Sequence, residues 1–171
     1  MIVVAPFSND ALRNWPRAHF ERLIDLCLAD LDHEIVLVGT GEQRQAINLM
    51  VRGRPSGRVS NVAGQWSWPR TVEALQQAEL IVANNSGIAH VGAKLGRPTL
   101  CLFAASHDPY EWGPRGPIVT TMYVRTACSP CAMATASGCR FGHVCMVELD
   151  PDTVFQTLRT MLEREEMHRQ L

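Results

Sequence analysis

Short apolar runs alternate with amphipathic segments along nearly the whole chain. The apolar runs predict six strands, at residues 2–5, 34–38, 59–63, 80–83, 99–103 and 118–124. Helical spacing of apolar residues predicts helices at 16–31, 42–51, 69–78 and about 151–168, with a short further helix between 84 and 96. Strand and helix alternation of this kind predicts an α/β fold with a mostly parallel sheet covered on both faces. Right-handed crossovers then favour a doubly wound, Rossmann-like strand order such as 3-2-1-4-5-6.

The segment 80–103 is the most informative part of this pattern, because it predicts a short strand–helix–strand crossover. Its polar turn follows a strand directly and therefore lies at the carboxyl edge of the sheet, where open α/β folds bind ligands. Asn85 and Ser86 can cap the helix, Gly87 lets a ligand approach the backbone, and exposed N–H groups attract an anion. His90, one turn further on, is in reach of the same anion. A phosphate site is predicted, against the alternatives of a plain N-cap and a core histidine.

Length and composition limit what else the chain can be. With 171 residues and 46% hydrophobic residues, residues 1–171 are predicted to form a single domain with its own core. A net charge of -1 and few aromatic residues (6%) argue against a nucleic-acid partner. No apolar run approaches the ~18 residues of a transmembrane helix, and the short run after Met1 lacks the features of a signal peptide. A cytoplasmic location is expected, including the surface of the inner membrane. The abrupt start on a strand suggests a piece of a longer protein.

Two common nucleotide-binding motifs are missing from the sequence. The turn after the first strand reads Pro6-Phe7-Ser8-Asn9-Asp10 and holds no GxGxxG motif. No GxxxxGK[ST] motif occurs anywhere in the chain. A dinucleotide-dependent oxidoreductase and a P-loop NTPase are therefore both disfavoured. Any nucleotide is expected at the turn that follows the fourth strand.

Several motifs together resemble glycosyltransferase family 9, the heptosyltransferases of lipopolysaccharide assembly and their relatives. They are APFSNDALRNWP near the start, VGTGE after the second strand, NNSGIAHVGAKLGRPTLCLF in the middle, HDPYEWGP, and the cysteine-containing tail that ends in HVCMVELDPDTV. The resemblance extends over nearly the whole chain, and its specificity comes from the order and spacing of the motifs. It implies the carboxyl-terminal, nucleotide-sugar-binding half of a GT-B fold, in which two Rossmann-like domains face each other across a cleft.

The resemblance also implies roles for individual residues. Arg13, two positions before Trp15, matches the basic residue that contacts the donor phosphates, and Glu42 matches the acidic residue that meets the nucleoside. The family's turn with an acidic residue, a hydroxyl residue, glycine and histidine falls here on Asn85, Ser86, Gly87 and His90. Relatives often carry aspartate where this chain has Asn85.

The implied reaction is inverting, metal-independent transfer of a sugar, of the ADP-heptose type, to a glycan or lipid acceptor. Arg13, the helix N-terminus at Ser86 and Gly87, and His90 would stabilise the departing diphosphate. The catalytic base is expected on an amino-terminal domain that this chain lacks, so the chain alone is expected to bind donor without turnover. The alternative is a non-catalytic Rossmann-like module that binds a nucleotide or a protein. A nucleotide-sugar epimerase is disfavoured, because the 84–90 turn has no carboxylates.

Four of the six cysteines gather in a predicted loop at 126–147. They are Cys128, Cys131, Cys139 and Cys145, and the first two form a Cys-x-x-Cys pair. Four thiols within one loop are typical of a structural zinc or iron site, and such a site would be closed and not catalytic. Free thiols without metal and disulfides are the alternatives. Cys27 and Cys101 lie in a predicted helix and strand and are expected to be buried.

Overall fold

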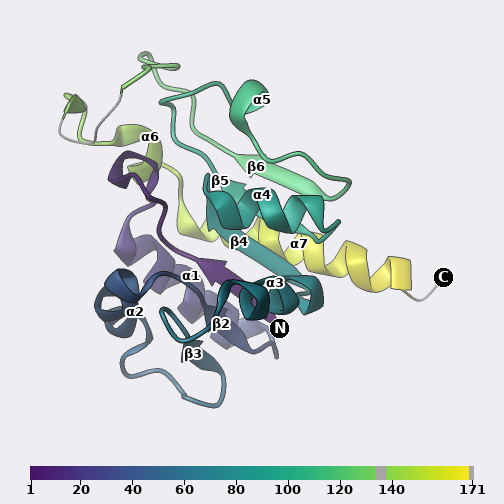
Figure 1. Cartoon of the computed structure of the whole chain (residues 1–171). Helices are drawn as coiled ribbons and strands as arrows, with labels where there is room; N and C mark the ends of the chain where they lie inside the picture. Colours follow the sequence, from purple (N-terminus) through teal and green to yellow (C-terminus); the bar gives the residue numbers. More distant parts are fainter. Residues whose placement is uncertain (134–137, 170–171) are drawn as a thin grey trace.

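The fold is built on one parallel six-stranded sheet. A computed structural model describes residues 1–133 and 138–169 of the chain. The strands lie in the order β3-β2-β1-β4-β5-β6, and every neighbouring pair is parallel (Figure 1). Their bounds are β1 Ile2–Ala5, β2 Ile35–Leu37, β3 Val59–Asn61, β4 Leu80–Asn84, β5 Thr99–Leu102 and β6 Val119–Met122. The predicted doubly wound α/β fold and its strand order are confirmed.

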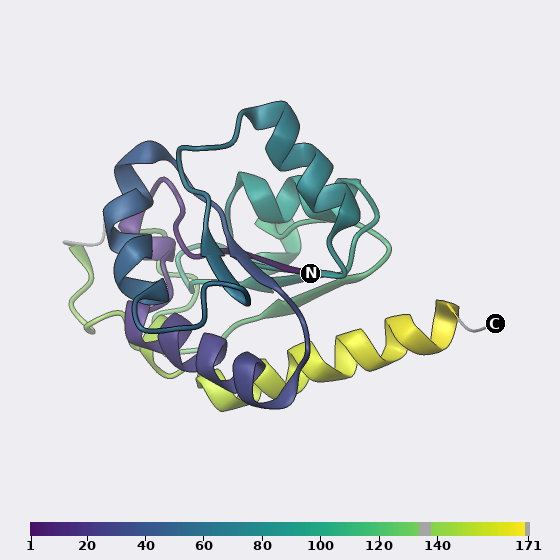
Figure 2. The same ribbon diagram turned by 90° about the horizontal axis from the view of Figure 1, so that it is seen from below.

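Helices cover both faces of this sheet. The longer ones are α1 Arg17–Asp30, α2 Arg44–Val51, α3 Trp68–Gln77, α4 Gly87–Lys94 and α7 Pro151–Arg169. Helices α1 and α7 pack against each other on one face, and α3 packs beside α4 on the other (Figure 2). Within residues 1–133 and 138–169, no helix has the length and apolar character needed to cross a bilayer.

The core lies on both sides of the sheet because neighbouring strand residues point to opposite faces. In β1, Ile2 and Val4 join the side chains of α1, α2 and α7, whereas Val3 and Ala5 join those of α3 and α4. The predicted burial of Cys27 and Cys101 is also confirmed. Burial raises the pKa of each of these thiols to about 12, so both remain protonated at neutral pH.

Short elements account for most differences from the predicted pattern. Pro16 occupies the N-cap position before α1 instead of the first helical position. The predicted helix 42–51 begins as a 3-10 turn, η2 Gly41–Gln43, before α2. The structure adds three pieces that the apolar spacing did not predict, η1 Ala11–Arg13, α5 Pro109–Trp112 and α6 Val144–Val147. They are too short to show a periodic pattern; side-chain caps from Asp10 and Asp108 stabilise η1 and α5, whereas α6 has no such cap.

The predicted cysteine-containing loop at 126–147 ends in a short helix. Its last four residues form α6 Val144–Val147. Residues 134–137, which belong to this predicted loop, lie outside the described residues. Met146 of α6 is fully buried and joins the core beside α7. The loop is therefore anchored at its end by an apolar contact with the domain.

Candidate functional site

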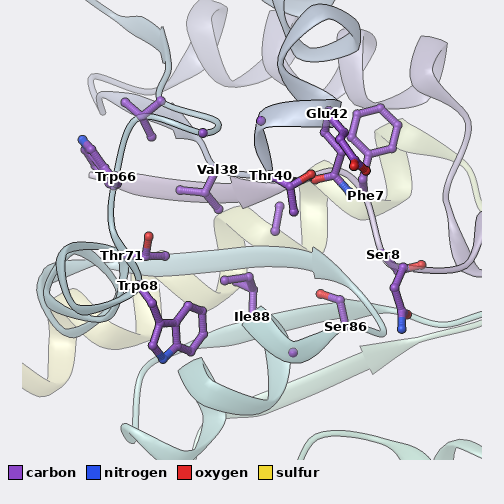
Figure 3. Close-up of a pocket in the computed structure, with 18 of the residues that line it drawn as sticks. Phe7, Ser8, Val38, Thr40, Glu42, Trp66, Trp68, Thr71, Ser86 and Ile88 are labelled. Carbon is purple, nitrogen blue, oxygen red and sulfur yellow. Dashed lines mark hydrogen bonds between the residues drawn. The ribbon is translucent and has the colours of Figure 1, made fainter.

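A cavity of about 1010 Å³ opens at the carboxyl edge of the sheet. Segments that follow β1, β2, β3 and β4 all contribute to its walls (Figure 3). In the strand order of this sheet, β1 and β4 are neighbours whose crossovers run in opposite directions, so the chain reverses between them. Open α/β sheets bind ligands at this kind of switch point. The fold therefore places the cavity where a ligand is expected.

Asn84, the last residue of β4, fixes the geometry of the switch point. Its side chain is fully buried. Its Oδ1 accepts a hydrogen bond from the backbone N–H of Trp15 at 3.0 Å, and its Nδ2 donates to the carbonyl of Pro6 at 2.7 Å. The indole N–H of Trp15 donates in turn to the carbonyl of Leu149 at 2.8 Å. The segments that follow β1 and β4 are therefore joined directly behind the cavity.

Arg13 reaches the cavity from the loop that follows β1. Asp10 starts the η1 turn of this loop, because its Oδ1 accepts the N–H of Leu12 at 2.9 Å. The Arg13 guanidinium donates from Nη1 to the carbonyl of Asn85 at 3.2 Å and from Nη2 to the side chain of Asn9. Arg13 forms no ion pair with any carboxylate of the described residues. Its charge is held in place and remains available to an anion.

The N-terminus of α4 opens on the same cavity. Ser86 occupies the N-cap position, but its side chain makes no capping hydrogen bond, and its Oγ is buried without a partner. Gly87 follows with open space around the position that a Cβ would fill. The prediction that the side chains of Asn85 and Ser86 cap this helix is wrong, because Asn85 bonds to His90 instead. The free N–H groups and the helix dipole favour an anion here.

His90 lies one turn into α4 and is exposed, so the alternative of a core histidine is wrong. Its Nε2 lies 3.1 Å from Oδ1 of Asn85. Partial burial and the nearby Arg13 charge both lower the pKa of His90. The ring is therefore neutral at pH 7, and a bound anion would favour its protonation.

Glu42 faces this anion site from across the cavity. It is exposed on the loop between β2 and α2, where the backbone N–H of Thr40 donates to Oε1 of Gln43 at 3.0 Å. Figure 3 shows Glu42 beside Phe7, with Ser86 on the opposite wall. Five of the six predicted donor-binding residues line this cavity, namely Arg13, Glu42, Ser86, Gly87 and His90. Asn85 does not, but it lines an adjoining cavity together with Arg13 and His90.

Two tryptophans lie at the far end of the cavity. Trp66 and Trp68 both line the cavity, and the Trp68 side chain is 55% exposed. The Arg70 guanidinium lies 5.2 Å from the centroid of the Trp66 ring. The sequence signal for their place in the cavity is that they follow β3, since the carboxyl ends of all parallel strands meet at this edge of the sheet. Trp15, by contrast, is buried in the core.

The four cysteines of the 126–147 segment are half-buried, and all six cysteines of the chain are free. Burial raises the pKa of Cys145, and the nearby thiols of Cys131, Cys128 and Cys139 raise it further. The backbone N–H of His143 donates to Sγ of Cys139 at 3.4 Å. Among the described residues, no three His, Cys, Asp or Glu side chains form a group that could hold a metal ion. The zinc or iron site therefore stays a prediction.

Sequence comparison connects the chain to one enzyme family. The model of glycosyltransferase family 9 (heptosyltransferase) matches residues 1–141. Lipopolysaccharide heptosyltransferase 2 of Escherichia coli strain K12 is 24% identical over 163 residues, which cover 90% of this chain and 44% of that protein. Lipopolysaccharide heptosyltransferase 3 of Escherichia coli is 26% identical over 115 residues, which cover 66% of this chain and 33% of that protein.

Solved structures show the same partial coverage. The ADP-heptose lipopolysaccharide heptosyltransferase II of E. coli matches with a TM-score of 0.82 and 22% identity, over 97% of this chain and 47% of that one. E. coli heptosyltransferase WaaC with ADP matches with a TM-score of 0.72 and 20% identity, over 94% of this chain and 43% of that one. The iron-containing heptosyltransferase TibC in complex with ADP-D-beta-D-heptose matches with a TM-score of 0.72 and 11% identity, over 96% of this chain and 45% of that one. These identities show a shared fold, and the chain spans less than half the length of each protein.

Proposed function

This chain belongs to glycosyltransferase family 9, and we propose that it forms the donor-binding, carboxyl-terminal half of a heptosyltransferase-like enzyme of lipopolysaccharide or related glycan assembly. Its proposed ligand is a nucleotide sugar of the ADP-heptose type. Two structural neighbours are described in complex with ADP and with ADP-heptose, which supports this class of ligand. The proposed amino-terminal domain would complete the cleft and bind a glycan or lipid acceptor, in the cytoplasm or at the inner membrane surface.

The observation that carries this proposal is the joint placement of five residues around the switch-point cavity. Arg13 and the N-terminus of α4 provide an unpaired cation and free N–H groups at one wall, which suits a diphosphate. Glu42 lies across from them, where a carboxylate can accept hydrogen bonds from ribose hydroxyls. The space beyond Glu42, towards Trp66 and Trp68, is left for the nucleobase.

The same groups suit the chemistry of a departing diphosphate. As the bond to the sugar breaks, negative charge grows on the leaving phosphate, and fixed positive groups stabilise that charge. Arg13 supplies a full charge, and the α4 dipole supplies a partial one. The single N–H of neutral His90 is used by Oδ1 of Asn85, so the ring gains a second donor only when it takes up a proton, which growing negative charge favours. We propose that these positive groups make transfer of the sugar feasible without a metal ion. Inversion would then be driven by a catalytic base on the proposed amino-terminal domain.

Asn85 bears on which sugar is transferred. Relatives often carry a carboxylate at this position, which would accept hydrogen bonds from two sugar hydroxyls. Here the side chain is an amide, and its Oδ1 already contacts Nε2 of His90 at 3.1 Å. An amide also offers donors, so the proposed sugar is heptose-like without a strict requirement for the manno configuration.

The test is a thermal-shift panel on the chain as it stands, with ADP, GDP, UDP and CDP sugars. A ligand at about 100 times its Kd adds about 2.7 kcal/mol of stability, which corresponds to a rise in Tm of roughly 5–10 °C for a chain of this size. ADP sugars should produce the largest shift, and Arg13→Gln and His90→Gln should reduce it. Arg22→Gln, which removes an exposed cation outside the cavity, is the matched control. If no nucleotide at millimolar concentration raises the Tm of the wild type, the proposal fails.

We propose, in addition, that Cys128, Cys131, Cys139 and Cys145 bind a structural zinc or iron ion. Four thiolates suit either metal, and all four cysteines are free and lie within one segment of the chain. The ligands of structural sites assemble as the metal binds, so the separated thiols are compatible with such a site. The neighbour TibC is described as iron-containing. Elemental analysis of untagged protein should give close to one equivalent, and less than about one-fifth would refute the proposal.

A further inference from the structure

A second cavity of about 350 Å³ adjoins the first. Arg13 and His90 line both cavities, so the proposed diphosphate position lies at their boundary. With the nucleoside on the Glu42 side, whatever follows the diphosphate points into the second cavity. The volume is within the range of about 300–1,000 Å³ that small-molecule sites occupy.

The walls of this second cavity carry more positive charge than a diphosphate at its edge requires. Its charged lining residues are Arg13, Lys94, Arg115 and Glu111, three cations and one carboxylate, which gives a net charge of +2. None of the three cations forms an ion pair within the part of the chain that the structure describes. Lys94 lies one turn beyond His90 on the same face of α4 and so points to the same cavity. Favourable interaction with the helix dipole could by itself explain a lysine in the last turn of α4, but it cannot explain Arg115, which lies outside the helix.

The loop that carries Arg115 is held tightly against α4. A Cβ on Gly116 would lie 2.2 Å from the carbonyl oxygen of Ala93, so only glycine permits this contact. Nη2 of Arg115 donates to the carbonyl of Tyr110 at 3.2 Å, which orients the guanidinium across the loop. Trp112 lines the same cavity, and its ring makes a T-shaped contact with that of His107 at 5.5 Å between centroids but remains 58% exposed. The HDPYEWGP motif and the Arg115 that follows it thus bring an aromatic ring and a cation to one place.

We propose that the second cavity binds an anionic substituent, a phosphate or a carboxylate, carried by a saccharide whose ring lies against Trp112. This inference rests on the proposed nucleotide-sugar function. The diphosphate has Arg13 and the α4 N-terminus, whereas Lys94 and Arg115 lie beyond it and match a further negative charge. Glu111 accepts hydrogen bonds from sugar hydroxyls. The anionic group belongs either to the transferred sugar or to the acceptor.

The test follows the indole N–H signals of the four tryptophans by NMR, with Trp112→Phe to assign the signal of interest. ADP-saturated protein is titrated with mannose 6-phosphate and, in parallel, with neutral mannose. The Trp112 signal should shift saturably with mannose 6-phosphate and not with mannose. Lys94→Gln and Arg115→Gln should each weaken binding by about threefold or more, because each removes a charge-assisted contact. Arg159→Gln, which removes an exposed cation on α7, is the matched control and should change nothing.

A second titration distinguishes the two sources of the anion. Protein saturated with ADP-glucose should exclude mannose 6-phosphate if the donor sugar fills the cavity, and should bind it unchanged if the cavity serves the acceptor. Equal responses to mannose and mannose 6-phosphate, or unchanged affinity in both cavity variants, would overturn the inference. An unshifted signal of the buried Trp15 verifies that each variant is folded. Failure of ADP itself to bind would instead refute the proposed function.

Discussion

The contact between Gly64 and Gly41 in the wall of the cavity at the sheet edge leads to a quantitative prediction. Gly64 has a φ of +68°, and an added Cβ would lie 2.5 Å from Cα of Gly41. Its backbone N–H donates to the carbonyl of Gly39 at 3.0 Å, so the loops after β2 and β3 meet backbone to backbone. A side chain on Gly64 therefore cannot be accommodated by rotating a neighbouring side chain.

Gly64→Ala should lower the free energy of unfolding by roughly 2–5 kcal/mol. A left-handed conformation costs a non-glycine residue about 1–2 kcal/mol, and overpacking against a well-packed neighbour costs about 1–3 kcal/mol. Two other glycines separate these contributions. Gly53 has a φ of +78° with nothing within 4 Å of an added Cβ, so Gly53→Ala should show the conformational cost alone. Gly57 has neither feature, so Gly57→Ala should be neutral or stabilise by about 0.4–1 kcal/mol.

Urea unfolding followed by circular dichroism measures all three variants on one scale. The affinity for an ADP sugar provides a second readout, because Gly64 is the one of these three glycines that lines the cavity, in contact with the loop that carries Glu42. Gly64→Ala should weaken binding, whereas Gly53→Ala and Gly57→Ala should leave it unchanged. If Gly64→Ala destabilises the chain no more than Gly53→Ala does, the backbone contact between the two loops is not as close as the structure has it.

Two further predictions concern the polar groups around the switch point. Asn84→Ala should lower the free energy of unfolding by roughly 2–4 kcal/mol in urea titrations, because it leaves the N–H of Trp15 and the carbonyl of Pro6 buried without partners; a loss under 1 kcal/mol would contradict this reasoning. Burial and Arg13 lower the pKa of His90 in the free protein, whereas a bound diphosphate raises it, so affinity for ADP-glucose should increase as pH falls below about 6.5. ADP-glucose has no terminal phosphate that titrates in this range. Calorimetry at pH 5.5 and 8 should show the effect in the wild type and not in His90→Gln.

Much of the fold follows from the sequence because the strands are buried on both faces. In Ile2–Ala5 and Leu80–Asn84, almost every position is apolar, and the helices between them have regular apolar stripes. These signals are local, so they predict the elements and, with crossover handedness, the strand order. The short elements η1, α5 and α6 depend on caps and loop contacts. A single capping residue, such as Asp10 or Asp108, is too weak a signal to predict an element of three or four residues.

The part of the candidate site that depends on one turn could be predicted from the sequence. The part that depends on contacts between several loops could not. The 84–90 turn follows a buried strand directly, so its place at the sheet edge could be inferred. Asn84 itself was not singled out, because its role requires Pro6 and Trp15, which lie far away in sequence. No local pattern marks Trp66 as a cavity residue, because its position after β3 is what brings it there.

The loop lengths after β1 and β4 explain why the proposed anion site belongs to α4. Either strand could present a helix N-terminus at the switch point, since the two are neighbours. After β1, however, the chain passes through a long loop and the η1 turn before α1 begins at Arg17, which displaces that helix start from the edge. After β4, α4 begins at Gly87, with only two residues between it and Asn84. The α4 N–H groups therefore remain at the edge, and the long β1 loop contributes a side chain, Arg13, instead of a helix dipole.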